Sequence, residues 1–156
     1  MQATSIVNIK KELKHKSPEE LTELCLRLSK FKKENKELIT YLLFESDNEG
    51  EYIESIKTHI DTQFDAINTK SFFFIRKSVR KILSQTKKYI RYSQKKETEV
   101  ELLLYFLKTL KHFKPSYKNS GQLQNLYNRQ LELVKKTVSG LHEDLQYDYN
   151  LLIENL

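Results

Sequence analysis

The chain has 156 residues, of which 38% are hydrophobic and 31% charged, and its formal net charge is +6. That length is typical of one domain that can bury a core of its own. Because only three Gly and two Pro are present, the sequence has too few turn residues for a many-stranded β fold, and we expect a single all-helical domain over residues 1–156.

The N-terminal segment, residues 1–16, has scattered apolar residues among its lysines. We expect an ordinary first helix here, since a signal peptide needs a continuous apolar region; an amphipathic organelle-targeting leader is the alternative. The longest apolar run of the chain covers only residues 102–107, whereas a membrane span needs about 20 residues. We therefore expect a cytoplasmic protein without a membrane partner. The Lys-, Asn- and Ile-rich composition suggests a bacterial source.

The first clear helix start is Ser17-Pro18-Glu19-Glu20, in which Ser17 and Glu20 form a capping box and Pro18 suits the first helical position. An apolar stripe follows at intervals of three or four residues: Leu21, Leu24, Cys25, Leu28 and Phe31. We expect Cys25, the only cysteine, to be a small buried residue of this stripe rather than a catalytic thiol. A chain with one cysteine forms no internal disulfide, which favours a reducing compartment.

Residues 38–44 are apolar on most sides, which is typical of a helix at the centre of its domain. Residues 46–50 (Ser-Asp-Asn-Glu-Gly) form the strongest loop signal of the first half. A further apolar stripe over residues 53–67 predicts the next helix, and Ser71 is a candidate cap for the one that follows it.

The segment from residue 66 to 96 contains ten Lys or Arg and no Asp or Glu, while the other 125 residues carry 17 basic and 21 acidic residues. On a helical wheel for residues 72–96, the apolar and the cationic residues occupy separate arcs. The sequence therefore predicts a helix that buries one side and presents a cationic ridge on the other. The residues of this ridge, at steps of four, seven, four and four, are Arg76, Arg80, Lys87, Arg91 and Lys95.

Like charges four residues apart on a helix repel each other by about 0.2–0.5 kcal/mol per pair. Acidic residues from elsewhere could neutralise the ridge inside the fold, and the candidates are Glu97, Glu99, Glu101 and the acidic C-terminal stretch (Glu143, Asp144, Asp148 and Glu154). A plain solvated face is a second interpretation. The third is a binding surface for an external anion, since Arg and Lys contact phosphates well. Neutralising about five phosphates of duplex DNA would give a salt slope near −4.5.

The second half contains two more apolar stripes. One covers residues 100–113 and ends before Pro115, and the other keeps one phase from Leu123 to Leu156 with a mean spacing of about 3.67 residues. A single helix over residues 123–156 would be about 51 Å long and would overhang a compact domain of about 40 Å. We expect a break or kink at Ser139-Gly140, because Gly weakens a helix interior; packing of the overhang on another subunit is the alternative.

The fold class predicted is therefore all-α, with seven or eight antiparallel helices in a bundle or in a short α-α superhelix. The three glycines form no phosphate-binding loop, and the four histidines lie on different segments without metal-site spacing. We accordingly predict no catalytic residues, no cofactor and no metal, and hence no enzyme.

The leading functional prediction is a non-enzymatic helical interaction module. Its basic helix, residues 72–96, would dock an acidic protein surface or a nucleic-acid backbone through Arg76, Arg80, Lys87, Arg91 and Lys95. No helix-turn-helix, zinc-finger or RNA-binding signature accompanies this helix. The alternative is a structural or assembly protein that forms a homo-oligomer through its C-terminal helix region, residues 123–156.

Overall fold

The computed structural model describes all 156 residues and contains eight α-helices, 79% helical residues and no strand. The prediction of an all-α fold with seven or eight helices is confirmed, and the contacts between helices are those of a bundle. The chain divides into two compact units, which we name the N-terminal unit (Met1–Phe44) and the C-terminal unit (Glu45–Leu156). The single domain expected over residues 1–156 stays a prediction.

The N-terminal unit consists of three short helices, α1 (Ile6–Leu13), α2 (Pro18–Phe31) and α3 (Lys33–Thr40), followed by the π-helix η1 (Tyr41–Glu45). The predicted capping box is present, since Glu20 N donates to Ser17 Oγ at 3.1 Å and Ser17 N donates to Glu20 Oε2 at 2.8 Å. Asn35 Nδ2 donates to the carbonyl of Leu28 at 2.8 Å and closes the corner between α2 and α3. These two helices pack against each other as a hairpin.

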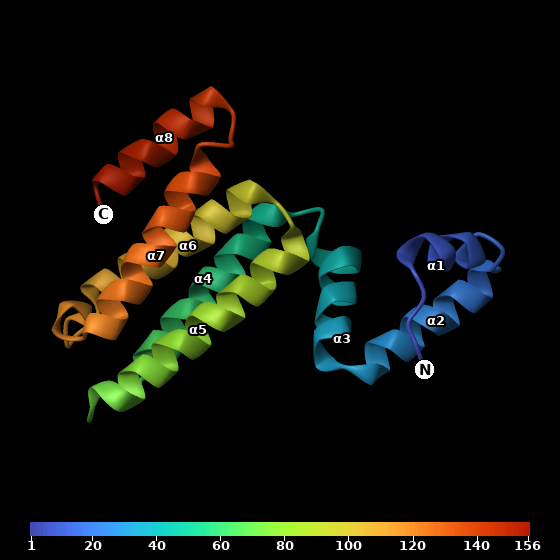
Figure 1. Cartoon of the computed structure of the whole chain (residues 1–156), viewed down its shortest axis with the longest axis horizontal. Coiled ribbons are helices and arrows are strands. Elements are labelled where there is room, and N and C mark those ends of the chain that lie inside the picture. The colour runs from blue at the N-terminus through green and yellow to red at the C-terminus, as the bar shows by residue number, and fades with distance from the viewer. The chain divides into compact units, whose positions relative to one another are not determined.

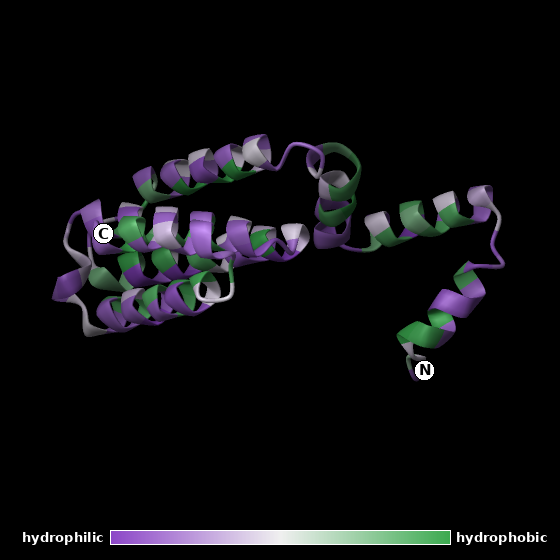
Figure 2. Ribbon diagram, turned by 90° about the horizontal axis from the view of Figure 1, so that it is seen from above, coloured by the Kyte–Doolittle hydropathy of each residue, from purple (hydrophilic) through white to green (hydrophobic).

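The apolar residues of the N-terminal unit are not enclosed, which corrects two predictions. Cys25 is exposed rather than buried. The segment 38–44 is not a central helix, because only Tyr41 in it is buried and Phe44 is 77% exposed. Periodicity shows which residues share a helix face, but it does not show what covers that face. Hydropathy varies along α2 as expected for an amphipathic helix (Figure 2).

The C-terminal unit is a bundle of helices that run alongside one another in alternating directions (Figure 1). Its elements in chain order are α4 (Glu49–Asp65), α5 (Phe72–Ser93), α6 (Lys96–His112), the short 3₁₀ helix η2 (Tyr117–Asn119), α7 (Gly121–Val138) and α8 (Glu143–Glu154). No helix combines the length with the apolar composition that crossing a bilayer requires.

Helix α6 is the centre of this bundle, because it packs against α4, α5 and α7. Its inward residues are fully buried, among them Phe106, whose ring lies 5.7 Å from the ring of Phe64 on α4. The neighbouring helices contribute the matching apolar stripes: Ile56, Ile60 and Phe64 from α4, Ile75, Val79 and Ile82 from α5, and Leu123, Val134 and Val138 from α7. Burial of these side chains supplies the main driving force for folding of the unit.

Two helix boundaries decide how the predicted sites are arranged. Helix α5 ends at Ser93 rather than at residue 96, because Gln94 adopts a left-handed conformation with φ 59° and terminates it. The predicted break at Ser139-Gly140 is confirmed, since α7 ends at Val138 and α8 begins at Glu143. The single overhanging helix that favoured self-association of residues 123–156 is therefore not formed.

Glu49, in the first turn of α4, joins the start of α4 to the connection between α5 and α6. Its Oε1 accepts hydrogen bonds from the hydroxyl groups of Ser93 and of Thr98, the latter at 2.6 Å, and its Oε2 lies 3.0 Å from Lys95 Nζ. Ser93 and Thr98 are buried, at 8% and 1% exposure. One carboxylate thus satisfies two buried hydroxyl groups, which would otherwise carry a desolvation cost.

Candidate functional site

The cations predicted to act together lie on α5, opposite its buried side. Residues Ile75, Val79, Ile82 and Ile90 face the bundle, and this fixes the rotation of the helix. Arg80 and Arg91 are exposed, while Arg76 and Lys87 are partly exposed. We call the set of Arg76, Arg80, Lys87 and Arg91 the basic face. From Arg76 to Arg91 it extends for about 22 Å along the helix axis.

Lys95 does not belong to this face, contrary to the predicted ridge. The reversal of the chain at Gln94 places Lys95 at the N-cap of α6. There its ammonium group forms the ion pair with Glu49. The helical-wheel prediction for residues 72–96 assumed a regular helix through Gln94, where the backbone in fact turns. It therefore placed Lys95 wrongly on the ridge.

The basic face is not neutralised from within the fold. None of its four residues forms an ion pair, and the carboxylates that were candidates for this role are engaged elsewhere or lack such a contact. Glu101 lies 3.5 Å from Lys57 Nζ on α4, and Asp144 lies 3.6 Å from His142 Nδ1. No carboxylate of the chain therefore lies within ion-pair distance of these four side chains.

A groove between α5 and α7 extends the basic face. Its volume is about 280 Å³, and it is lined by Arg80, Leu83, Gln122, Asn125, Leu126, Arg129 and Gln130. Arg80 Nη2 donates to Gln122 Oε1 at 2.9 Å across the groove, and the buried Oε1 of Gln130 has no hydrogen-bond partner. A second depression of about 310 Å³ continues along α5 past Ser84, Lys87 and Arg91. The groove thus adds a cation, Arg129, and neutral amide groups that the sequence pattern of α5 did not reveal.

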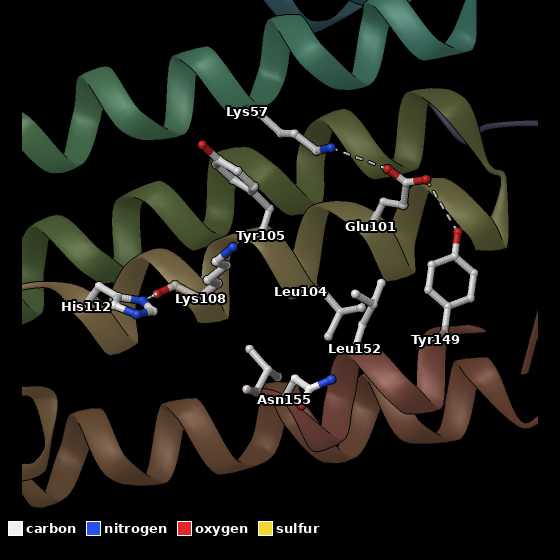
Figure 3. A pocket seen from close by; sticks show the side chains of 10 residues that line it. Lys57, Glu101, Leu104, Tyr105, Lys108, His112, Tyr149, Leu152 and Asn155 are labelled. Atoms are coloured by element: carbon white, nitrogen blue, oxygen red, sulfur yellow. Dashed lines mark hydrogen bonds and ion pairs between the residues drawn. The ribbon is translucent and has the colours of Figure 1, made fainter. Parts of the chain in front are cut away.

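A different pocket of about 350 Å³ lies over α6, between α4 and α8 (Figure 3). Leu104, Leu152 and Leu156 form its apolar part. Its polar lining residues are Lys57, Glu101, Tyr105, Lys108, His112, Tyr149 and Asn155. Figure 3 shows Glu101 between Lys57 on α4 and Tyr149 on α8, with Tyr149 Oη 3.4 Å from Glu101 Oε1. This pocket joins three helices that are far apart in the sequence, so spacing alone gave no signal for it.

Three ionisable groups of this pocket, Lys57, Tyr105 and Tyr149, have raised pKa values. The hydrogen bond to Asp61 raises the pKa of Tyr105 to about 12, and burial raises the pKa of Tyr149 to about 12. Burial lowers the pKa of Lys57, but the hydrogen bond to Glu54 and the charge of Glu101 outweigh it, so the pKa is raised overall. All three shifts move away from neutral pH, whereas acid–base catalysis needs a pKa near the working pH. These three shifts do not suit Lys57, Tyr105 and Tyr149 to proton transfer near neutral pH.

We expect Asp61→Ala to lower the pKa of Tyr105 from about 12 towards the ordinary value of 10, because Tyr105 donates to Asp61 Oδ2 at 2.5 Å. Folding favours the neutral phenol, so the stabilisation from this contact is complete below pH 10 and is lost as the pH rises from 10 to about 12. A titration of ¹³Cζ-labelled tyrosines by NMR measures the shift. Asp65→Ala removes a neighbouring exposed carboxylate and should leave the titration of Tyr105 unchanged.

The other residue types considered for chemistry do not gather into a site. No group of three or more His, Cys, Asp or Glu has the arrangement of a metal centre. His59 contacts the ring of Tyr89 at 5.9 Å and lies 3.5 Å from Gln85 Oε1, within the contact between α4 and α5. The basic face with its groove and the pocket over α6 are accordingly the two places where side chains with binding chemistry converge.

Searches of protein-family models, of curated proteins and of solved structures found no match to this chain.

Proposed function

We propose that this chain is a non-enzymatic interaction module whose basic face, extended by Arg129 on α7, binds the phosphate backbone of a nucleic acid. The observation that carries this proposal is that Arg76, Arg80, Lys87 and Arg91 share one face of α5 without a carboxylate partner. A polyanion would release counterions from such a face, and this release drives much of the affinity of proteins for nucleic acids.

The make-up of the face favours a nucleic acid over an acidic protein. Protein interfaces usually depend on a few buried aromatic or aliphatic anchors surrounded by a polar rim. Here the only apolar residues of the groove are Leu83 and Leu126, of which Leu83 is buried and Leu126 half-buried. The amide groups of Gln122 and Asn125 lie beside the arginines, and such neutral groups commonly contact phosphate and sugar oxygens. An acidic protein surface is the second candidate.

One observation still supports self-association through residues 123–156. Tyr147, Leu151 and Leu152 on α8 are 67%, 42% and 56% exposed. Two of these three side chains are apolar, and an exposed apolar patch often marks a contact with another protein. The break between α7 and α8 removes the other argument for this function, so we place it behind the nucleic-acid interface.

Fluorescence anisotropy with a labelled duplex and a labelled single strand, at several salt concentrations, tests the proposal. We expect binding at low salt and a slope of log K against log salt near −4.5 for the duplex if about five cations contact phosphates. Arg80→Glu combined with Arg91→Glu should abolish measurable binding, because each substitution replaces an attraction with a repulsion. Absence of binding at low salt would contradict the proposal.

The matched control is Lys111→Glu combined with Lys114→Glu, which changes the net charge of the C-terminal unit equally at exposed positions at the end of α6 and just after it, outside the basic face and the groove. This variant should bind nearly as well as the unaltered chain. Equal losses in both variants would mean that only net charge matters, against a specific face. Binding of polyglutamate in preference to the oligonucleotides would instead identify an acidic protein as the partner.

A further inference from the structure

The hairpin formed by α2 and α3 has an apolar face that nothing in the N-terminal unit covers. The exposed side chains on it are Leu24 at 39%, Leu28 at 60%, Phe31 at 77%, Leu38 at 37% and Leu42 at 55%. Between the two helices they border a groove of about 240 Å³, lined by Cys25, Leu28, Ser29, Asn35, Leu38, Ile39 and Leu42. The face is therefore shaped to receive protruding side chains and is not a flat surface.

This hairpin has too small a buried core to be stable by itself. Tyr41 is the one buried residue of the 44 in the unit. Helices as short as α1 and α3, of eight residues each, are marginal in water unless an apolar side packs against something. Units near this size usually need an added metal, disulfide or subunit contact, and the single Cys25 excludes an internal disulfide. An occupant for the face is therefore needed.

We propose that the occupant is the same hairpin of a second copy of this chain, placed so that α2 and its counterpart run antiparallel in a four-helix dimer. Two observations select this occupant. The first is area: the five exposed side chains together present roughly 500 Å² of apolar surface, which is about the apolar share of the 800 Å² that each partner contributes to a stable interface. A two-fold dimer needs only this one face, because the same patch serves both copies.

The second observation is the charge pattern at the edge of the face. On a wheel of α2, Glu20 and Arg27 lie next to each other at one edge of the apolar stripe, seven residues apart. When two copies of α2 pack antiparallel, the edge that carries Glu20 and Arg27 in one copy lies beside the same edge of the other copy. The two-fold axis then passes between residues 23 and 24. Glu20 of one copy then lies beside Arg27 of the other, and this happens twice. Such edge pairs fix orientation more than strength.

The exposed edge groups remain open to such a contact. Arg27 forms no ion pair within the chain. Glu20 uses Oε2 for the capping box, and its Oε1 accepts no hydrogen bond within the chain. The antiparallel dimer would therefore satisfy both groups without disturbing the start of α2.

Light scattering coupled to size exclusion, on the full chain from about 1 to 200 µM, measures the association. We expect a dimer, and we expect Leu28→Asp to raise the dissociation constant at least about 100-fold, because it places two charges in the centre of the interface. Leu26→Asp is the matched control: the same substitution, on the same helix, at a leucine that is 53% exposed but lies away from the face. It should leave the dimer intact.

A charge swap tests the orientation. Arg27→Glu should weaken the dimer about tenfold because it faces Glu20 of the second copy, and adding Glu20→Arg should restore association. The reactivity of Cys25 towards a maleimide provides an independent measure, since the thiol lines the covered groove. It should be low in the dimer and high in Leu28→Asp.

Four results would overturn the proposal. A monomer at 200 µM with a reactive Cys25 would show that the face stays open, and a monomer with a protected Cys25 would show that another part of the same chain covers it. A dimer that Leu28→Asp leaves unchanged would place self-association elsewhere, for instance on α8. Flotation with anionic phosphatidylglycerol vesicles that Leu28→Asp abolishes, without dimer formation, would identify a lipid surface as the occupant. All of these readouts are independent of nucleic-acid binding.

Discussion

Replacing Phe106 with Ala should lower the free energy of unfolding of the C-terminal unit by about 3–5 kcal/mol. Phe106 is fully buried at the centre of α6, and its ring contacts that of Phe64 on α4. The substitution removes apolar surface and leaves a cavity among helices that cannot all move inward together. Since a domain of this size is stable by only about 5–15 kcal/mol in total, the variant should unfold at a much lower urea concentration, as followed by circular dichroism at 222 nm.

Phe73→Ala serves as the comparison, because Phe73 starts α5 and is 63% exposed. Its loss should change the stability by less than about 0.5 kcal/mol. If the two phenylalanine variants were equally stable, α6 would not be the central helix of the bundle. A lower m-value in Phe106→Ala alone would indicate that the unfolding is no longer two-state, and the free energy would then need a three-state fit.

Glu49→Ala should destabilise the C-terminal unit by about 2–4 kcal/mol, because it leaves two buried hydroxyl groups without their acceptor. Ser93 and Thr98 both donate to Glu49 Oε1, and Lys95 loses its ion pair at the same time. Since Lys95 is half exposed, its share of the loss should be small. Chemical denaturation at moderate salt measures the change.

Glu51→Ala is the matched control for this prediction. Glu51 lies in the same first turn of α4, so its removal costs the same favourable interaction with the helix dipole, and its side chain is exposed. Glu49→Gln keeps a carbonyl oxygen that accepts hydrogen bonds and should retain about half of the lost stability. Equal effects of Glu49→Ala and Glu51→Ala would contradict a role for the buried hydroxyl groups.

Much of the fold was predictable because it depends on local patterns. The apolar stripes of α4 to α7 defined four helices, and Gly140 with its neighbour Ser139 located the break before α8. The end of α5 was placed three residues too late. A left-handed Gln94 is not expected from sequence, since Gly and Asn usually occupy that position.

Only the part of the candidate site that lies on one helix was predictable from the sequence. Arg76, Arg80, Lys87 and Arg91 follow from the charge pattern of α5, whereas Arg129 and Gln122 lie on a helix that tertiary packing brings beside it. The pocket over α6 shows the same limit, because its lining residues come from α4, α6 and α8. Spacing along one chain segment contains no information about such convergence.

The prediction for Cys25 failed for a different reason. An apolar stripe on α2 was assumed to face the interior, since most such stripes do. The structure shows the same stripe open to solvent. Sequence periodicity alone cannot distinguish a face that is buried within the chain from a face that stays open to solvent.

The concentration of positive charge on α5 also affects how the bundle resists heat. Neighbouring cations on this helix repel each other in the folded state, and an unfolded chain keeps them farther apart. If an anionic polymer occupies the face as proposed, it removes this penalty and binds the folded form more tightly than the unfolded chain, in which the cations are dispersed. At a hundredfold excess over its dissociation constant, a ligand without affinity for the unfolded chain would add about 2.7 kcal/mol to the stability of the folded state. The partner would thus act as a thermal protectant of the bundle, and the bound protein would survive temperatures at which the free protein melts.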